Sequence, residues 1–292
     1  MNRICLTLCL VILTLTTAMA QRTTKTSPKF GPPNGKLLIV GGGVIDSELW
    51  QKFVELAGGG DARIVVVPTA GMTVPDDGKV PESQVPRILG SLGVHQITIL
   101  HTTDRSVADS VAFIKPIQEA TAVWFDGGRQ WHLADSYLHS KTEKAFHDLL
   151  ERGGIIGGTS AGATIQGSYL VRGDTSGPDI VQGDHTEGFN FLRGVAIDQH
   201  ILARNRQFDL VPLIETHPDL LGIGINESTA ILVTGDQFEV FGASYVAITD
   251  ANQWKAKRSA SPNDSARKGK IYFIGRGTKF DLVTRRVLNR RG

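Results

Sequence analysis

The chain has 292 residues, of which 41% are hydrophobic and 21% are charged, a composition typical of a globular protein with one large or two small domains. Its net charge of +2 gives no strong field of the kind that attracts nucleic acids or anionic membranes, so we expect neither as a partner.

The first twenty residues have the three parts of a secretory signal peptide. Arg3 precedes an apolar run over residues 4–15, and Ala18 and Ala20 supply the small residues of a cleavage site. The apolar run is too short for a comfortable transmembrane helix. We therefore expect a signal peptide over 1–20, cleavage before Gln21, and export to the periplasm or the extracellular space without a membrane anchor.

Both cysteines of the chain, Cys5 and Cys9, lie in this signal, so the mature protein would have none. A cysteine nucleophile, a disulfide framework and a thiolate zinc site are thereby excluded for the mature protein. No metal-binding spacing such as H-E-x-x-H appears, and we expect no metal and no cofactor. The polar, proline-rich residues 21–35 predict a disordered lead-in, and residues 36–292 a single domain, because no second core and no internal repeat is found.

From Lys36 onward, short apolar runs alternate with amphipathic segments. The runs that predict buried strands are KLLIV, RIVVVPTA, HQITIL, TAVWFDGG and GIIGGTS. The segments SELWQKFVELAGG and SKTEKAFHDLLERGG predict helices, the second with a capping box of Ser140 and Glu143 and a stop at Gly153. This alternation predicts an α/β fold of three layers, in which a mostly parallel sheet carries helices on both faces.

Small-residue turns follow four of the predicted strands: GGG, PTAG, FDGG and GGTSAG. The carboxyl ends of parallel strands meet at one edge of a sheet, and small residues there let the backbone approach a ligand. After Asp209 the pattern changes to short strands with turn residues, which predicts a β-rich C-terminal segment of hairpins. The polar residues 252–270 predict an exposed loop.

Residues 158–162, Gly-Thr-Ser-Ala-Gly, match the G-x-S-x-G pattern of a nucleophile elbow. They follow a strand-like run and precede a potential helix, which is the context that such an elbow needs. Small neighbours would allow the strained turn that exposes the serine oxygen. We predict that Ser160 is a nucleophile; the alternative is an ordinary glycine-rich turn.

A serine hydroxyl is a weak nucleophile without a base, and three histidines follow Ser160 in the chain. The α/β-hydrolase order of serine, acid and histidine fits poorly, because a long segment follows the last histidine. His185 and His217 lie in loop-like surroundings that are typical of surface histidines. His200 is the preferred base because polar residues crowd around it. They are Asp198, Gln199, Arg204 and Arg206.

Two carboxylates compete for the role of the acid. Glu227 follows an apolar, glycine-rich run, where a carboxylate is unusual unless it has a partner. Asp174, in VRGDTSG, is the competing acid.

The motifs GGTSAGA, DQH followed by RNR, GIGINE, AILVTGDQFEV and WFDGGRQ together resemble cyanophycinase-type peptidases of family S51, over about residues 36–287. The resemblance implies a fold similar to class I glutamine amidotransferases, with a serine in place of the cysteine nucleophile, and a homodimer by analogy. It implies a triad of Ser160, His200 and Glu227 that cleaves β-aspartyl peptide bonds. Cyanophycin, a polyaspartate with arginine on each side-chain carboxyl, is the family's named substrate.

Further positions carry over from the resemblance. Relatives with an acid soon after the serine would make Asp174 the alternative acid, and the amides of Gly128 and Ala161 would form the oxyanion hole. The positions that match substrate-binding residues are Gln130, Asp198, Gln199, Arg204 and Arg206. Guanidinium groups suit an acidic or β-aspartyl peptide substrate, because they bind carboxylates bidentately.

Two positions depart from the family pattern. Cyanophycinases typically have Asp where this chain has Arg129, and a further basic residue where it has Asp209. Both changes alter the charge near the expected pocket and leave the triad intact, so which β-aspartyl peptide is cleaved stays open. A non-catalytic binding protein of the same fold and an esterase or amidase for small substrates are the alternative functions.

Overall fold

The computed structural model describes residues 27–72, 79–252 and 271–288. The predicted signal peptide, the first residues of the lead-in and nearly all of the predicted loop at 252–270 lie outside these ranges. No helix within the described ranges combines the length and the apolar character needed to cross a lipid bilayer.

A nine-stranded sheet forms the centre of the fold, in the order β15-β14-β11-β10-β1-β5-β4-β2-β3. Its strands are β1 (Lys36–Val40), β2 (Arg63–Val67), β3 (Gln96–Ile99), β4 (Ala122–Phe125), β5 (Ile155–Thr159), β10 (Thr229–Thr234), β11 (Gln237–Gly242), β14 (Lys279–Asp281) and β15 (Arg286–Val287). The five strands from β1 to β3 in this order are mutually parallel, and each was predicted from an apolar run.

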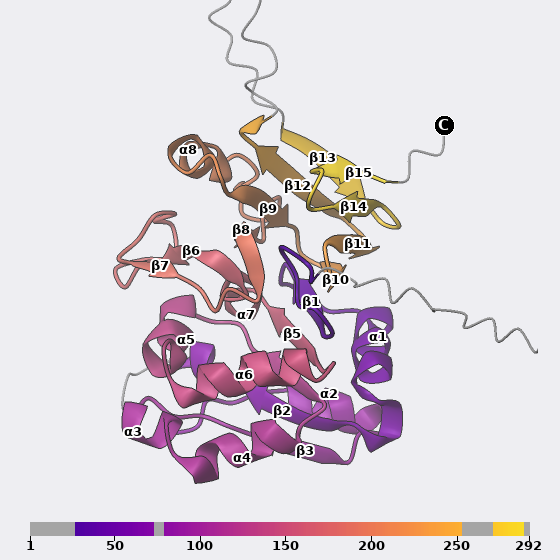
Figure 1. Ribbon diagram of the computed structural model, residues 1–292, viewed down its shortest axis with the longest axis vertical. Helices are drawn as coiled ribbons and strands as arrows, with labels where there is room; N and C mark the ends of the chain where they lie inside the picture. The colour runs from indigo at the N-terminus through magenta and orange to yellow at the C-terminus, as the bar shows by residue number, and fades with distance from the viewer. Residues whose placement is uncertain (1–26, 73–78, 253–270, 289–292) are drawn as a thin grey trace, which may run out of the picture.

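Helices cover both faces of this parallel part, which confirms the predicted α/β fold (Figure 1). The helices of the described ranges are α1 (Ser47–Ala57), α2 (Val85–Ser91), α3 (Arg105–Ala108), α4 (Val111–Glu119), α5 (Gln130–Tyr137), α6 (Lys141–Glu151), α7 (Ala161–Thr164) and α8 (Leu210–Thr216), the last of which packs on a second sheet instead. Because side chains alternate along a strand, Leu38 and Val40 of β1 pack with α1 and α2, whereas Leu37 and Ile39 pack with α4, α5 and α6.

Helix α6 shows how local sequence sets an element's bounds. The Ser140 hydroxyl accepts a hydrogen bond from the Glu143 N–H at 3.1 Å, as the capping box predicts. The Glu143 carboxylate accepts from the N–H of His139, one residue before the cap, at 2.5 Å. The helix ends just before Gly153, whose φ of 94° is readily adopted by glycine.

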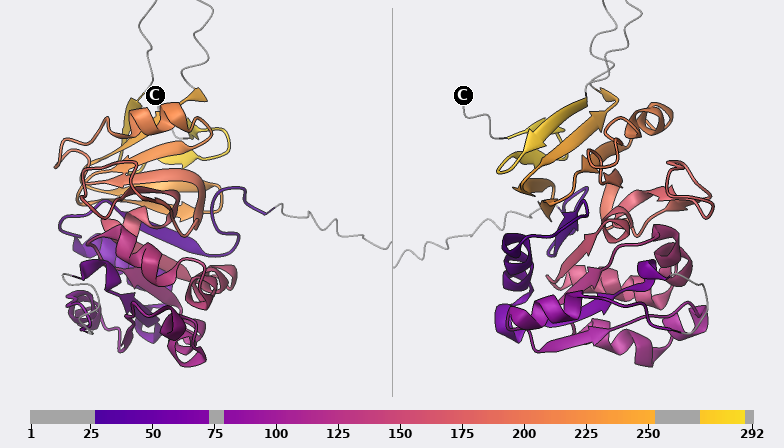
Figure 2. Two further views of the ribbon diagram at one scale, coloured as in Figure 1. Left: turned by 90° about the vertical axis from the view of Figure 1, so that its left-hand side faces the viewer. Right: turned by 180° about the vertical axis from the view of Figure 1, so that it is seen from behind.

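A second sheet of six strands, in the order β13-β12-β9-β8-β6-β7, was not predicted. Its strands are β6 (Gly167–Gly173), β7 (His185–Glu187), β8 (Leu192–Gln199), β9 (Leu221–Ile225), β12 (Tyr245–Asp250) and β13 (Ile271–Gly275). Figures 1 and 2 show β12 and β13 at one end of the molecule and β3 with α4 at the other.

The predicted β-rich C-terminal segment is present, but its strands are divided between the two sheets. Strands β10 and β11 form the expected hairpin, whereas β13 pairs with β12 and β14 pairs with β11, so these two do not form one. Apolar periodicity identifies a strand but does not say which sheet it joins.

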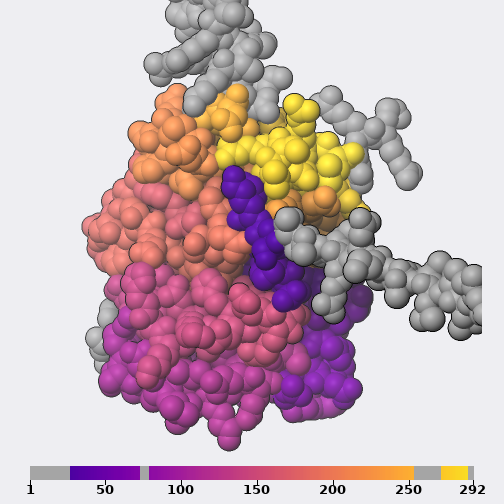
Figure 3. Space-filling model, in the orientation of Figure 1, coloured from indigo at the N-terminus to yellow at the C-terminus, as the bar shows by residue number. Residues whose placement is uncertain are grey.

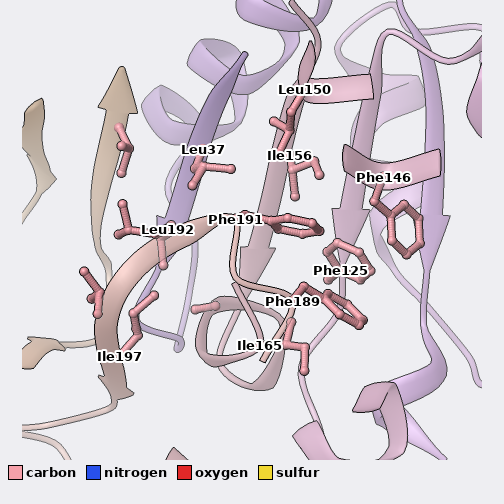
Figure 4. Close-up of a cluster of buried hydrophobic side chains, with 14 of the residues drawn as sticks. Leu37, Phe125, Phe146, Leu150, Ile156, Ile165, Phe189, Phe191, Leu192 and Ile197 are labelled. Atoms are coloured by element: carbon pink, nitrogen blue, oxygen red, sulfur yellow. The ribbon is translucent and has the colours of Figure 1, made fainter. Parts of the chain in front are cut away.

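One hydrophobic core joins the two sheets (Figure 4). The ring centroids of Phe125 and Phe146 lie 5.0 Å apart, and those of Phe189 and Phe191 lie 5.4 Å apart. Leu37 and Ile156 from the first sheet and Leu192 and Ile197 from β8 complete this part of the core. The carboxyl ends of strands from both sheets are therefore held in a fixed relation.

The predicted disordered lead-in needs a correction, because residues 27–35 pack onto the rest of the chain. Phe30 is buried, and its N–H donates to Asp236 Oδ1 at 2.7 Å. The Arg193 guanidinium donates to the carbonyls of Pro28, Lys29 and Gly31. Figure 3 shows this indigo segment against the C-terminal strands. The polar composition of this segment predicted disorder. The prediction missed that Phe30 is buried and that Arg193, far away in the sequence, binds the backbone of the segment.

Candidate active site

The residues predicted to form the triad come together at the carboxyl ends of strands. Ser160 follows β5, His200 follows β8 and Glu227 lies just beyond β9, while the turn Gly41–Gly43 follows β1. Helix α7 lies between β5 and β8, where the two sheets meet (Figure 1). Parallel strands place their ligand sites at this edge.

Ser160 occupies a strained turn between β5 and α7. Its φ of 55° and ψ of −112° are uncommon for a residue with a side chain. The neighbouring glycines allow close approach: a Cβ on Gly158 would lie 2.3 Å from the Gly162 carbonyl oxygen, and one on Gly162 would lie 2.2 Å from that of Phe125. The Gly-rich sequence around the serine is therefore a packing requirement of a sharp strand-to-helix turn.

A continuous chain of hydrogen bonds links the three side chains. His200 Nε2 lies 2.9 Å from Ser160 Oγ, and His200 Nδ1 lies 2.5 Å from Glu227 Oε1. An ionised carboxylate only accepts, so Nδ1 carries the proton and the Nε2 of a neutral ring is left to accept from the serine hydroxyl. The imidazole is buried, whereas 37% of the Glu227 side chain is exposed.

The turn Gly41–Gly43 holds the histidine and the glutamate in place. The carbonyl of Gly41 accepts from the His200 N–H at 2.9 Å. A Cβ on Gly42 would lie 2.1 Å from His200 Cε1, and one on Gly43 would lie 2.8 Å from Glu227 Cβ. The sequence marked this turn only as a close-approach point for a ligand. Three glycines after a buried strand indicated a close approach of the backbone. They did not indicate that the partners would be the base and the acid.

Burial lowers the pKa of His200 below its ordinary value of 6.5. The hydrogen bond that Nδ1 donates to Glu227 works to raise this pKa, and the charges of Arg204 and Arg206 work to lower it further. The net shift is downward, which favours the neutral form of the imidazole, the form that can accept a proton.

The predicted oxyanion residues lie beside Ser160. A Cβ on Gly127 would be 3.2 Å from Ser160 Cβ, which places the FDGG turn directly against the serine. Gly128 has a φ of 140° and backs onto the Ala70 carbonyl, where only a glycine fits. Ala161 is the first residue of α7, and an N–H in that position has no acceptor within its own helix.

Asp174, the competing acid, is engaged elsewhere. Its Oδ1 accepts from the Ser176 N–H at 2.8 Å and its Oδ2 from the Asp184 N–H at 3.3 Å, in the turn that follows β6. The structure thus brings Glu227, rather than Asp174, to the Nδ1 of His200.

The residues predicted to bind substrate differ in their exposure. Gln130, Asp198, Gln199 and Arg206 are buried, and Arg204 is exposed. Gln130 Nε2 donates to the Val171 carbonyl at 2.7 Å. Arg206 donates to Gln199 Oε1 at 3.5 Å and to Asp179 Oδ1 at 3.1 Å. Gln130 and Arg206 are therefore hydrogen-bonded to neighbouring parts of the fold.

Sequence reasoning missed Arg172, which is buried in β6 and binds Asp198, one of the residues predicted to bind substrate. Its guanidinium binds both carboxylate oxygens of Asp198, at 2.8 and 2.9 Å, and Asp209 Oδ2 at 2.6 Å. Burial works to lower the pKa of Arg172, but the hydrogen bonds and charges of both carboxylates outweigh it and raise that pKa. A single arginine in the apolar run YLVRGD was the only sign. Asp209, one of the two departures, is thus neutralised by a buried cation.

The chain matches a known family of peptidases over most of its length. The sequence model described as Peptidase family S51 matches residues 37–241, most of the chain. The chain belongs to peptidase family S51. It is therefore a serine-type peptidase, and the resemblance to cyanophycinases is confirmed.

The S51 peptidase has curated relatives and solved structural neighbours over most of its length. It is 28% identical to a cyanophycinase of Geminocystis herdmanii over 85% of this chain and 94% of the relative. It is 31% identical to a cyanophycinase of Synechococcus elongatus over 77% of this chain and 71% of the relative. The crystal structure of a peptidase from an acI-B1 Actinobacterium matches with a TM-score of 0.58 and 22% identity, covering 85% of this chain and 96% of that one.

A putative peptidase E protein from Listeria monocytogenes matches with a TM-score of 0.53 and 20% identity, covering 72% of this chain and 99% of that one. At these identities, both solved structures support the fold alone.

Proposed function

We propose that this S51 peptidase hydrolyses β-aspartyl isopeptide bonds through an acyl-enzyme formed on Ser160. The observation that carries the proposal is the unbroken hydrogen-bond chain from Ser160 through His200 to Glu227. A buried imidazole with a lowered pKa, held by a carboxylate on one nitrogen and facing a serine on the other, has the arrangement of a general base.

The proposed reaction has two halves. Ser160 Oγ attacks the β-carbonyl carbon while its proton passes to His200 Nε2, and the C–N bond then breaks as Nε2 returns that proton to the leaving amine. A water molecule attacks the resulting ester in the same way and releases the β-carboxylate and the free serine. Glu227 stabilises the imidazolium that forms in each half.

The amides of Gly128 and Ala161 are the proposed oxyanion hole. Both belong to turns that converge on Ser160, and backbone N–H donors fixed in such positions do not need to reorganise during the reaction. One such donor contributes about 3 kcal/mol to stabilising the transition state.

The proposed substrates are cyanophycin or related β-aspartyl peptides. Support comes from relatives that are named cyanophycinases and from the arginines near the base. Arg204, which is exposed, and Arg206 would bind substrate carboxylates, while Gln130, Asp198 and Gln199 would shape the site.

A cleavage assay tests this function. The mature protein and its Ser160→Ala variant are incubated with β-Asp-Arg polymer, an isoaspartyl dipeptide, an α-linked dipeptide, a small ester and a simple amide, and products are followed by mass. We expect the wild type to cleave β-linked substrates only. No cleavage of any peptide would favour a non-catalytic binding protein, and cleavage confined to small esters or simple amides would favour an esterase or amidase.

The proposal includes export. The signal-like residues 1–20 lead us to place the mature N-terminus at Gln21, in the periplasm or outside the cell. Intact-mass analysis of the exported protein measures this directly. A soluble product that keeps Cys5 and Cys9 would contradict it.

The low pKa of His200 predicts the pH dependence of the reaction. The base must be neutral to accept the serine proton, so lowering its pKa extends activity to lower pH. We expect the acid limb of kcat/KM to lie below pH 6.5, the ordinary value for histidine. Arg204→Gln removes a charge that disfavours the imidazolium, so the limb should move to higher pH at low salt. A limb at or above pH 6.5 that does not respond to Arg204→Gln would contradict this account.

Gly42→Ala tests whether the glycine turn positions the base. The added methyl carbon would lie 2.1 Å from His200 Cε1, so the imidazole must move, and kcat/KM should fall about 100-fold. Gly59→Ala is the matched control, because Gly59 also has a positive φ, of 66°, but nothing lies within 4 Å of the added carbon. Gly59→Ala should lose about 1–2 kcal/mol of stability from backbone strain, and Gly42→Ala should lose more because of its clash with His200, as measured by denaturant unfolding. Equal kinetics in the two would show that the turn does not position His200.

A further inference from the structure

Arg129 stands at the end of the turn that touches the nucleophile. Two residues before it, Gly127 lies against Ser160, with its Cβ position 3.8 Å from Ser160 Oγ. The Arg129 N–H donates to the Ala70 carbonyl at 2.8 Å, and the residue caps the start of α5. The backbone of Arg129 is therefore fixed two residues from the point where this turn contacts Ser160.

The Arg129 guanidinium is half-buried and has no ionic partner among the residues that the structure describes. One terminal nitrogen donates to the Asp174 carbonyl, and Nε is buried without any hydrogen-bond partner. Across the described ranges, no carboxylate forms an ion pair with this side chain. The nearby Asp174 carboxylate is occupied, since its oxygens accept the N–H groups of Ser176 and Asp184.

Two other arginines near the site have carboxylates that balance their positive charge. Arg172 binds Asp198 and Asp209, and Arg206 binds Asp179. Removing a charge from water is costly unless a counter-charge and hydrogen bonds replace the solvent, and one neutral carbonyl does this only in part. Within the described part of the chain, Arg129 thus lacks a counter-charge, and a ligand could supply one.

We propose that Arg129 binds a substrate side-chain carboxylate and selects β-aspartyl peptides whose second residue is acidic over those in which it is arginine. This inference rests on the proposed β-aspartyl hydrolysis and names its substrate class. One terminal nitrogen donates to Asp174, and the other is not among the buried unpartnered atoms, so a substrate carboxylate placed against it would pair the charge in a charge-assisted hydrogen bond. A substrate arginine in the same place would meet a like charge.

The isosteric pair β-Asp-Glu and β-Asp-Gln tests the negative charge alone, and β-Asp-Arg tests a charge of the opposite sign. The dipeptides β-Asp-Glu, β-Asp-Gln and β-Asp-Arg are supplied in equal amounts, and the ratios of kcat/KM are measured for wild type, Arg129→Gln and Arg129→Asp. The wild type should prefer Glu over Gln by roughly ten- to hundredfold, the range for a charge-assisted hydrogen bond. Arg129→Gln should bring that ratio near one, and Arg129→Asp should make β-Asp-Arg the preferred substrate.

Arg105→Asp is the matched control. Arg105 also donates to a single backbone carbonyl, that of Asp135, but it is exposed on α3. Reversing its charge should leave the substrate ratios unchanged. Calorimetric binding of β-Asp-Glu to Ser160→Ala, with and without Arg129→Gln, gives a readout that needs no turnover, and thermal unfolding reports on the fold of each variant.

The outcomes separate this inference from the proposed function. This inference alone is overturned if the wild type hydrolyses all three dipeptides with kcat/KM ratios near one, or if Arg129→Gln does not change the ratios. Arg129 would then serve only to hold the turn at Asp174 through its hydrogen bond to the backbone. If the wild type leaves every β-aspartyl dipeptide intact, β-Asp-Gln included, both the proposed function and this inference fall.

Discussion

Replacing Ser160 or His200 with alanine should reduce kcat by roughly five to six orders of magnitude, and the double variant should be barely slower than either single one. Ser160→Ala removes the attacking oxygen, and His200→Ala removes the group that takes its proton. The two side chains are 2.9 Å apart and perform one step together, so losing either loses the step. Rapid kinetics on an isoaspartyl dipeptide measure all three variants.

Ser91→Ala serves as the matched serine control, because its exposed hydroxyl donates only to a helix carbonyl. It should keep wild-type kcat. Each variant's thermal unfolding should stay close to that of the wild type, which separates lost chemistry from lost fold. If Ser160→Ala kept full β-aspartyl hydrolysis, or if the two alanine effects multiplied, the residues would not act as one catalytic unit.

Glu227→Gln should have the next largest effect, a loss of roughly 10⁴-fold in kcat, smaller than that of Ser160→Ala. The amide nearly preserves the shape of the side chain, but it removes the charge that stabilises the imidazolium. It can also donate to Nδ1, which would leave the proton on the wrong ring nitrogen. The 2.5 Å contact between Nδ1 and Oε1 makes the tautomer depend on this one carboxylate.

Asp174→Asn is the control for the competing acid. Its carboxylate accepts two backbone N–H groups, and an asparagine keeps one acceptor oxygen, so we expect a small change in kcat. Inactivation by Asp174→Asn together with near-normal activity of Glu227→Gln would reassign the acid and leave the roles of Ser160 and His200 intact.

The first sheet was predictable because its information is local. Each central strand is a short apolar run that ends in small residues, and α6 has its own cap and stop. The second sheet was not, because β8 and β9 join it through pairings that periodicity does not encode. For the same reason, the sequence did not show that β13 and β14 belong to different sheets.

The candidate site shows the same contrast. The Gly-rich motif around Ser160 is a local pattern and could be found without the fold. The pairing of His200 with Glu227 requires two strand ends from the second sheet to reach the end of β5 in the first. Arg172 and the lead-in around Phe30 could not be predicted, because their partners, Asp198 and Asp236, are known only from the folded chain.

The most direct test of the central claim is to locate the acyl group during turnover. A β-aspartyl p-nitroanilide, whose leaving group departs readily, is mixed with the mature protein, and acid-quenched samples are mapped by mass spectrometry. We predict a burst of nitroaniline equal to the enzyme present and an aspartyl ester on the peptide containing Ser160. The account is contradicted if the aspartyl group is found on another residue, or if Ser160→Ala releases nitroaniline at the wild-type rate.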